Sequence, residues 1–160
     1  MTLALKLSKL RHKVIILDKN SKKKLLELKD SRTSAISQGS SRILKDISIW
    51  DKIKEKAQPI NEINVSEGIN TNELNFKSQS VNEGPLGYIV DNTYLKKTFF
   101  KEVLKSSFIK FIGGIKIKDI KRTSNNATIL TDKGNFSASL IIGADGRNSR
   151  MRFFADIKSF

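Results

Sequence analysis

The chain has 160 residues, about the length of one domain with its own hydrophobic core. Its hydrophobic content of 38%, in alternating strand-like and helix-like stretches, predicts a globular α/β fold rather than a disordered chain. There is no cysteine, which excludes disulfides and thiolate metal sites and is typical of a cytoplasmic protein. No apolar run approaches the roughly 20 residues of a membrane span. Lys6 and Lys9 interrupt the apolar N-terminal stretch, so we expect no signal peptide.

The formal net charge is +14, with lysine dominating over arginine. Such a charge attracts nucleic acid or an anionic membrane surface. It also follows from the lysine-, asparagine- and isoleucine-rich composition expected of an AT-rich genome. The basic residues are spread along the chain, and the dense run Lys22 to Lys24 lacks the interleaved aromatic residues of a nucleic-acid platform. We favour compositional drift as the explanation of the positive charge. The functional alternative is peripheral attraction to a membrane, and we do not expect nucleic acid as a partner.

The N-terminal third reads as part of a nucleotide-binding fold. Hydrophobic spacing predicts a helix at 2–11 and a buried strand at 14–17 that ends in Asp18, which is typical of the second half of a Rossmann βαβ unit. The charged stretch 19–31 predicts a loop with some helix at 25–28. The polar stretch 31–41 predicts a second loop, which could lie against a ligand through its backbone, and 42–56 predicts a single helix. In the first helix Leu3, Leu7 and Leu10 are expected to share one apolar face, which Ala4 and Leu5 widen. In the later helix the side chains at core spacing are Ile43, Leu44, Ile47 and Trp50.

The rest of the chain predicts short strands around one helix. Strands at 60–66 and 74–76 are expected to form a separate small sheet, and a strand at 86–90 follows the Gly84-Pro85 turn. Asp91 or Asn92 is suited to cap a helix that runs to about residue 106. Further short strands are expected within 108–120 and at 127–131, 135–138 and 140–142, with a hairpin turn at 132–134.

Two positions in the N-terminal third are candidates for binding a nucleotide. Asp18 closes a buried strand, where a carboxylate can accept the hydroxyl hydrogens of an adenosine ribose; an ordinary acid at a strand end gives the same pattern. Arg32 lies among the small residues of 30–37 and could hold a pyrophosphate through a charge-assisted fork; a solvated loop arginine is the alternative.

The strongest candidate is the segment 145–152, which follows the apolar run 140–142. Gly146 permits close backbone approach and a positive φ, and Asp145 could bond a ribose or order an arginine. Ser149 could cap a following helical turn, which would place Arg152 on the same side. A strand-turn-helix connection without a ligand would have the same pattern. With a single histidine, His12, and no cysteine, we expect no metal site, and any catalysis must come from a cofactor.

Taken in order, these segments resemble the ubiquinone-biosynthesis branch of the FAD-dependent aromatic monooxygenases, which is related to p-hydroxybenzoate hydroxylase. The stretches that carry the resemblance are Met1 to Leu7, Val14 to Asp18, Asp30 to Ile36, Gly87 to Asn92 and Gly143 to Arg152. The resemblance implies an α/β fold consisting of a partial Rossmann-like FAD-binding domain with an inserted small β-sheet. It divides the chain into a partial FAD-binding domain at 1–58, part of a substrate-domain sheet at 59–92 and a return to the FAD-binding domain at 93–160.

The resemblance also implies roles for individual residues. Asp18 would bind the adenosine ribose of FAD, and Asn92 would begin a helix whose first turn faces FAD. The ribityl and pyrophosphate groups would lie along Arg32, Thr33, Ser34, Ala35 and the backbone to Ile36. Asp145, Gly146 and Arg152 would form the motif that handles FAD and NAD(P)H.

The implied reaction is the hydroxylation of a polyprenylated phenol with NAD(P)H and O₂. The family's glycine-rich loop would precede Thr2, and its later Gly-Asp motif would follow Phe160, so we expect a fragment that alone is inactive and binds FAD weakly or not at all. Implied partners are the substrate, other ubiquinone-biosynthesis enzymes and the inner face of a membrane. The alternatives are another oxidoreductase with the FAD fold, or a non-catalytic basic module that binds an anionic membrane or nucleic acid.

Overall fold

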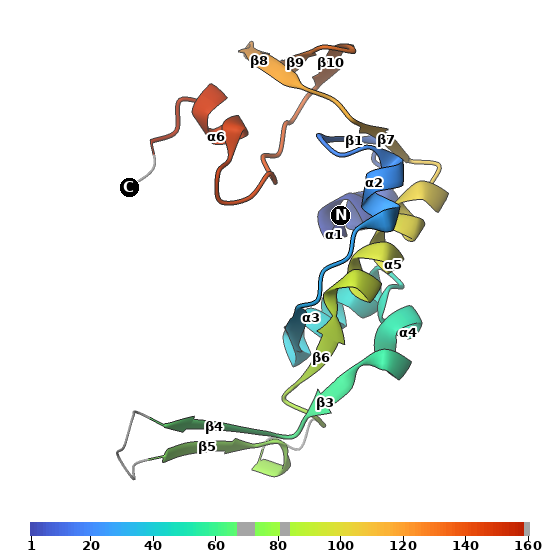
Figure 1. Ribbon diagram of the computed structural model, residues 1–160. Helices are drawn as coiled ribbons and strands as arrows, with labels where there is room; N and C mark the ends of the chain where they lie inside the picture. The colour runs from blue at the N-terminus through green and yellow to red at the C-terminus, as the bar shows by residue number, and fades with distance from the viewer. Residues whose placement is uncertain (67–72, 81–83, 159–160) are drawn as a thin grey trace. The chain divides into compact units, whose positions relative to one another are not determined.

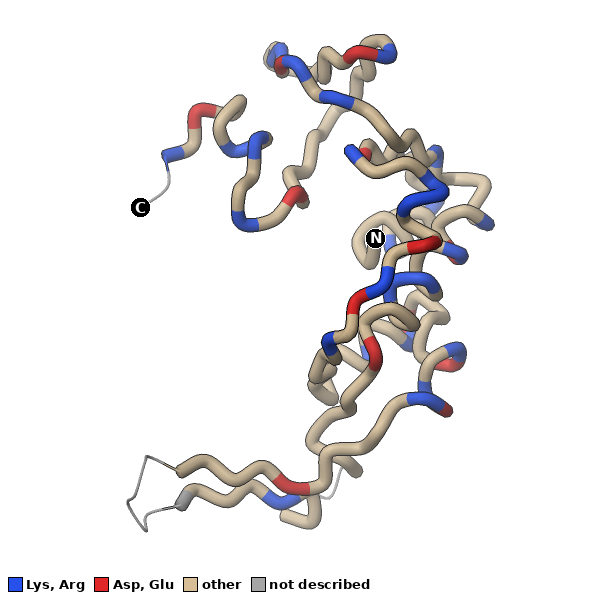
Figure 2. Tube along the Cα trace, viewed as in Figure 1, with Lys and Arg blue, Asp and Glu red and all other residues tan. Residues whose placement is uncertain are grey.

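The computed structural model describes residues 1–66, 73–80 and 84–158, and it is a mixed α/β structure, as the sequence predicts. The chain divides into two compact units (Figure 1). Unit 1 comprises residues 1–16 and 22–111, and unit 2 comprises residues 17–21 and 112–160. Lysine and arginine outnumber acidic residues in the chain (Figure 2). The proposed boundaries at residues 58 and 92 remain a prediction.

Unit 1 is built around the helix α5 (Asn92–Lys105), which packs against α1 (Thr2–Lys9), α2 (Lys22–Glu27) and α4 (Trp50–Ile53). Asp91 caps α5, because its carboxylate accepts the amide hydrogen of Tyr94 at 2.7 Å. The core includes Phe100 and Val103 from α5, both almost completely buried. The predicted helix and its cap are confirmed.

A three-stranded antiparallel sheet lies next to these helices in unit 1, in the order β2-β6-β3. Its strands are β2 (Thr33–Ser37), β6 (Gly87–Asp91) and β3 (Gln58–Ile60). The prediction of a loop over 31–41 is therefore wrong. The small side chains of β2 suit close pairing with β6. At the end of β2, Ser37 caps the helix α3 (Gln38–Asp46) by accepting the amide hydrogen of Ser40 at 3.2 Å.

The single helix predicted at 42–56 is broken at Ser48, where φ is +57°. The chain forms α3, then α4, then a 3₁₀ turn, η1 (Lys54–Lys56). After the break Ile49 and Ile53 are completely buried, whereas Ile43 in α3 is exposed. In α1 the predicted residues Ala4 and Leu5 are buried together with Ser8, whereas the predicted core residues Leu3 and Leu10 are exposed.

The predicted small sheet is present as the antiparallel pair β4 (Glu62–Ser66) and β5 (Glu73–Lys77), followed by the 3₁₀ turn η2 (Ser78–Ser80). Ile63 pairs with Phe76 and Val65 pairs with Leu74, so all four apolar side chains share one face of the ribbon. All four are exposed. Two strands alone form a marginally stable unit.

Unit 2 contains an antiparallel meander in the order β10-β9-β8. Its strands are β8 (Ile117–Arg122), β9 (Ala127–Thr131) and β10 (Gly134–Ala138), and the helix α6 (Arg150–Phe154) follows. Gly134, with φ of +110°, completes the predicted hairpin turn. The strands β1 (Val14–Asp18) and β7 (Ile109–Gly113) pair with each other, and each has residues in both units.

The strand predicted at 140–142 does not form. Leu140 and Ile142 are exposed, and none of the strands in the described part of the chain pairs with them. An apolar run of this kind becomes a buried strand only when neighbouring strands satisfy its backbone groups. The segment therefore runs without regular secondary structure into the loop at Asp145.

Candidate functional site

Arg32 in unit 1 is held by a neighbouring carboxylate. Its Nε and one Nη donate to the two carboxylate oxygens of Asp30 at 2.8 and 2.9 Å, and Lys96 from α5 adds a third cationic contact to the same carboxylate. The Asp30 side chain is 9% exposed, whereas that of Arg32 is 78% exposed. Two of the five guanidinium N–H groups are used in this fork, so the remainder face solvent in a fixed orientation. Arg32 is thus exposed, as the solvated alternative predicts, but its orientation is fixed.

Asp30 joins this arrangement to α5 in a second way. Its backbone N–H donates to Thr93 Oγ1 at 2.8 Å, and its carbonyl accepts from the same hydroxyl at 3.0 Å. Hydrogen bonds from Arg32 and Lys96 hold the pKa of Asp30 well below its ordinary value, and the same pair raises the pKa of Arg32. Sequence reasoning assigned no role to Asp30, Thr93 or Lys96. The two-residue spacing of Asp30 and Arg32 was the available signal.

The strand after Arg32 presents backbone groups at an open edge. Arg32 O accepts the Asn92 amide hydrogen at 3.0 Å, which marks one of the alternating hydrogen-bonded positions between β2 and β6. The backbone N–H groups of Thr33 and Ala35 therefore point towards the opposite edge. In the described part of the chain no strand covers that edge. The Ser34 hydroxyl instead donates to Asn92 Oδ1, at the start of α5, at 2.5 Å.

Asp18 lies at the end of β1, in unit 2. Its Oδ1 accepts the amide hydrogen of Asn20 at 2.7 Å, and its carbonyl accepts that of Ile115 at 3.2 Å. An ionised carboxylate has about four acceptor positions. The Asn20 bond orients the side chain and leaves acceptor positions for the hydroxyl groups of a ligand.

Asp145 in unit 2 organises its own loop. Its carboxylate accepts from the Ser149 hydroxyl and from the Met151 amide, the latter at 3.1 Å. Desolvation acts to raise the pKa of Asp145, but these hydrogen bonds outweigh it and lower the pKa below its ordinary value. Gly146 takes a φ of +86°, as its predicted role requires. Ser149 caps α6 by accepting the Arg152 amide hydrogen at 3.1 Å, which confirms the predicted cap.

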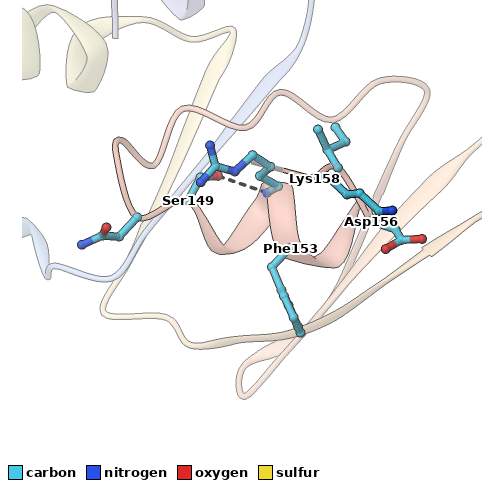
Figure 3. Close-up of a pocket in the computed structure, with 7 residues that line it drawn as sticks. Ser149, Phe153, Asp156 and Lys158 are labelled. Atoms are coloured by element: carbon cyan, nitrogen blue, oxygen red, sulfur yellow. Dashed lines mark hydrogen bonds between the residues drawn. The ribbon is translucent and has the colours of Figure 1, made fainter. Parts of the chain in front are cut away.

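A cavity of about 520 Å³ lies beside α6 (Figure 3). Its lining combines the cations Arg152 and Lys158 with one acid, Asp156, so it suits an anionic ligand. Ser149 and Arg152 line this cavity together, as their spacing predicts. The other lining residues are Asn148, Phe153 and Ile157.

The whole chain, residues 1–160, matches the family model described as the FAD binding domain. The chain belongs to this family. The FAD-binding domain is 30% identical over 158 residues to the ubiquinone hydroxylase UbiL of Rhodospirillum rubrum, covering 98% of this chain and 37% of that protein. It is 28% identical over 130 residues to the 3-demethoxyubiquinol 3-hydroxylase of Escherichia coli, covering 80% of this chain and 33% of that protein. The resemblance found in the sequence is confirmed.

Solved structures show the same fold. The FAD-binding domain superimposes on the p-nitrophenol 4-monooxygenase PnpA from Pseudomonas putida with a TM-score of 0.77 at 18% identity, covering 96% of this chain and 40% of that structure. It superimposes on PqsL from Pseudomonas aeruginosa with a TM-score of 0.75 at 14% identity, covering 99% of this chain and 43% of that structure. The chain thus spans about a third of the curated relatives above and about two fifths of these structures.

The donors and acceptors of the FAD-binding domain fit FAD, the cofactor that the family indicates. A fixed, exposed guanidinium and the open N–H edge of β2 suit a pyrophosphate. The carboxylate of Asp18 suits ribose hydroxyl groups. Asp145 differs from these, because its carboxylate is already engaged within its loop. None of the helices in the described ranges is long and apolar enough to cross a membrane.

The pair of Asp30 and Arg32 gives a pH-dependent prediction. Because folding lowers the pKa of Asp30, the pair stabilises the fold above the ordinary value of about 3.9, and that stability is lost as the pH falls through the folded value. Asp30→Asn should therefore lower the free energy of unfolding at pH 7, and the difference from wild type should shrink below about pH 4. Urea unfolding across this range measures it.

Asp51→Asn is the matched control, since Asp51 pairs with Lys54 while its side chain is 71% exposed. An exposed pair of this kind contributes about 0–1 kcal/mol. Equal losses for the two variants at pH 7, or a difference for Asp30→Asn that does not change with pH, would contradict the assignment.

Proposed function

We propose that this chain is the FAD-binding part of a monooxygenase that hydroxylates a polyprenylated phenol in ubiquinone biosynthesis, with NAD(P)H as the reductant. The observation that carries the proposal is the 30% identity to a ubiquinone hydroxylase over 98% of the chain. The similarity to a demethoxyubiquinol hydroxylase supports the same substrate class. Other enzymes of ubiquinone biosynthesis and the inner face of a membrane are the proposed partners.

In this proposal the residues of unit 1 hold the charged backbone of FAD. Arg32, fixed by Asp30, provides the cation for the pyrophosphate. Thr33 and Ala35 donate their backbone N–H groups from the open edge of β2, and Ser34 holds Asn92 at the start of α5. These groups orient the cofactor without taking part in proton transfer.

The residues of unit 2 have separate roles in this proposal. Asp18 accepts the ribose hydroxyl hydrogens of the adenosine, and Asp145 keeps its loop in place through Ser149 and Met151. Gly146 lets the backbone approach FAD or NAD(P)H, and Arg152 adds a cation for their phosphate groups. FAD, when bound, supplies the redox chemistry that no side chain here provides.

A titration with FAD, followed by flavin fluorescence, tests the proposal. We expect weak but saturable binding, through the fixed guanidinium of Arg32 and the open N–H edge of β2. Arg32→Gln should weaken it by about tenfold or more, as expected for a hydrogen bond to a charged group worth about 1.5–3 kcal/mol. Asp18→Asn should weaken it as well.

Arg11→Gln serves as the control, because Arg11 is an exposed arginine in the turn after α1. It removes the same charge and should leave the affinity for FAD unchanged. If Arg32→Gln and Arg11→Gln bind FAD equally well, Arg32 does not contact the cofactor. Purification of the chain with stoichiometric flavin would contradict the expectation of weak binding.

A further inference from the structure

Two helices of unit 1 that pack against each other both carry lysines. The helix α2 packs against α5, and its leucines Leu25 and Leu26 are half-buried. No residue of α2 is fully buried, and Lys22 and Lys23 are exposed. Figure 2 marks the lysines of both helices in blue. Lys23 and Lys97 are 97 − 23 = 74 residues apart in the sequence, and the packing of α2 on α5 places their helices next to each other.

The outer side of α5 continues this surface. Phe99 and Val103 are buried, and Lys97 and Lys101 follow the opposite side at a spacing of four residues, with Lys101 exposed and Lys97 half-buried. Like charges at this spacing destabilise a helix by about 0.2–0.5 kcal/mol. The pair therefore does not stabilise α5, and a binding partner of opposite charge would relieve the repulsion.

Two of the acidic residues close to these helices are paired with other cations, whereas Glu27 of α2 is exposed and forms none of the ion pairs of the described residues. Asp30 is paired with Arg32 and Lys96, and Glu102 is paired with Lys52 at 3.2 Å and with Lys105 at 3.0 Å. Within residues 1–66, 73–80 and 84–158, no ion pair engages the four lysines 22, 23, 97 and 101. We name these four residues the α2–α5 lysine surface.

We propose that the α2–α5 lysine surface binds the anionic headgroups of a phospholipid bilayer. Lysine ammonium groups on flexible side chains suit a fluid array of phosphates, and each lysine near such a surface contributes about 1 kcal/mol to the binding free energy. A nucleic-acid platform needs exposed aromatic rings for stacking. Tyr94 of α5 does not serve here, because the Lys56 ammonium lies 4.5 Å from its ring centre and its hydroxyl donates to Lys52 O. The α2–α5 lysine surface would make the membrane contact that is part of the proposed function, and it rests on that function only in assuming that the protein meets a membrane.

Vesicle co-sedimentation of the full chain tests the proposal. Wild type should bind vesicles of phosphatidylglycerol in phosphatidylcholine, should bind phosphatidylcholine alone at least tenfold more weakly, and should be released by salt. The variant K22Q/K23Q/K97Q/K101Q should bind the anionic vesicles at least about tenfold more weakly, since about 1 kcal/mol per lysine corresponds to about fivefold for each.

The control variant K45Q/K110Q/K118Q/K121Q removes four exposed lysines from other elements. Both variants change the net charge from +14 to 14 − 4 = +10. The control should keep vesicle binding within about threefold of wild type, and both variants should keep the thermal unfolding and the FAD affinity of wild type. Equal losses in the two variants, equal binding to neutral vesicles, or tighter binding to duplex DNA than to anionic vesicles at the same salt would overturn the proposal. Retained FAD binding separates such a failure from a failure of the proposed function.

Discussion

Replacing Phe100 with alanine should lower the free energy of unfolding of unit 1 by about 3–5 kcal/mol. Phe100 is 1% exposed on the buried side of α5, and its ring meets that of Phe111 edge-on at a centroid distance of 4.9 Å. The substitution removes the transfer free energy of the ring and leaves a cavity that a close-packed core fills only in part. Urea unfolding followed by circular dichroism measures the change.

Phe153→Ala is the matched control, because the Phe153 side chain on α6 is 79% exposed. It should change the free energy of unfolding by no more than about 0.5 kcal/mol. If Phe100→Ala does not fold at all, Phe100→Leu provides a milder truncation of the same contact. Similar small effects for Phe100→Ala and Phe153→Ala would contradict the assigned core.

Gly87→Ala should destabilise the chain by about 1–3 kcal/mol. A Cβ at Gly87 would lie 2.7 Å from the carbonyl oxygen of Ile36, which belongs to the backbone of β2. The strand cannot move away without losing its pairing with β6, and that pairing positions the open edge after Arg32. Weaker FAD binding should accompany the loss of stability, and thermal unfolding with an FAD titration measures both.

Gly39→Ala is the same substitution in α3, where an added Cβ meets nothing within 4 Å. It should leave the stability unchanged or raise it by up to about 1 kcal/mol, because alanine favours helix. A destabilisation by Gly39→Ala as large as that by Gly87→Ala would show that contact with Ile36 is not the cause.

Local patterns were sufficient for several elements. The alternation of β4 and β5, the Asp91 cap of α5 and the turn at Gly134 depend on neighbouring residues alone, and each is present in the structure. The predicted Ser149 cap is also local. Sequence reasoning succeeded where the deciding contacts lie within a few residues.

Other elements depended on partners that are distant in sequence. Residues 33–37 read as a polar loop, but β6 pairs with them more than fifty residues later. The run 140–142 read as a buried strand, but no described strand pairs with it. Strand formation is settled by the partner that satisfies the backbone hydrogen bonds, and a single segment does not reveal that partner.

The sequence revealed some residues of the candidate site, and the structure revealed others. Asp18, Arg32, Asp145, Gly146 and Arg152 were all apparent from motifs in the sequence. The carboxylate that fixes Arg32 was not, because its burial depends on Thr93 and Lys96 from α5. Whether these residues bind the cofactor remains a prediction that the FAD titration tests.

The sequence by itself determined the family, the mixed α/β class and the excess of positive charge, since these follow from ordered motifs and composition. Only the tertiary structure decided which charged segments become neighbours. Lys22 and Lys23 are distant in sequence from Lys97 and Lys101, and the packing of α2 on α5 places their helices next to each other. The physical reason is that burying apolar side chains such as Leu25, Leu26 and Phe100 drives the helices together. The spacing of the charged side chains along the chain does not reveal this neighbourhood.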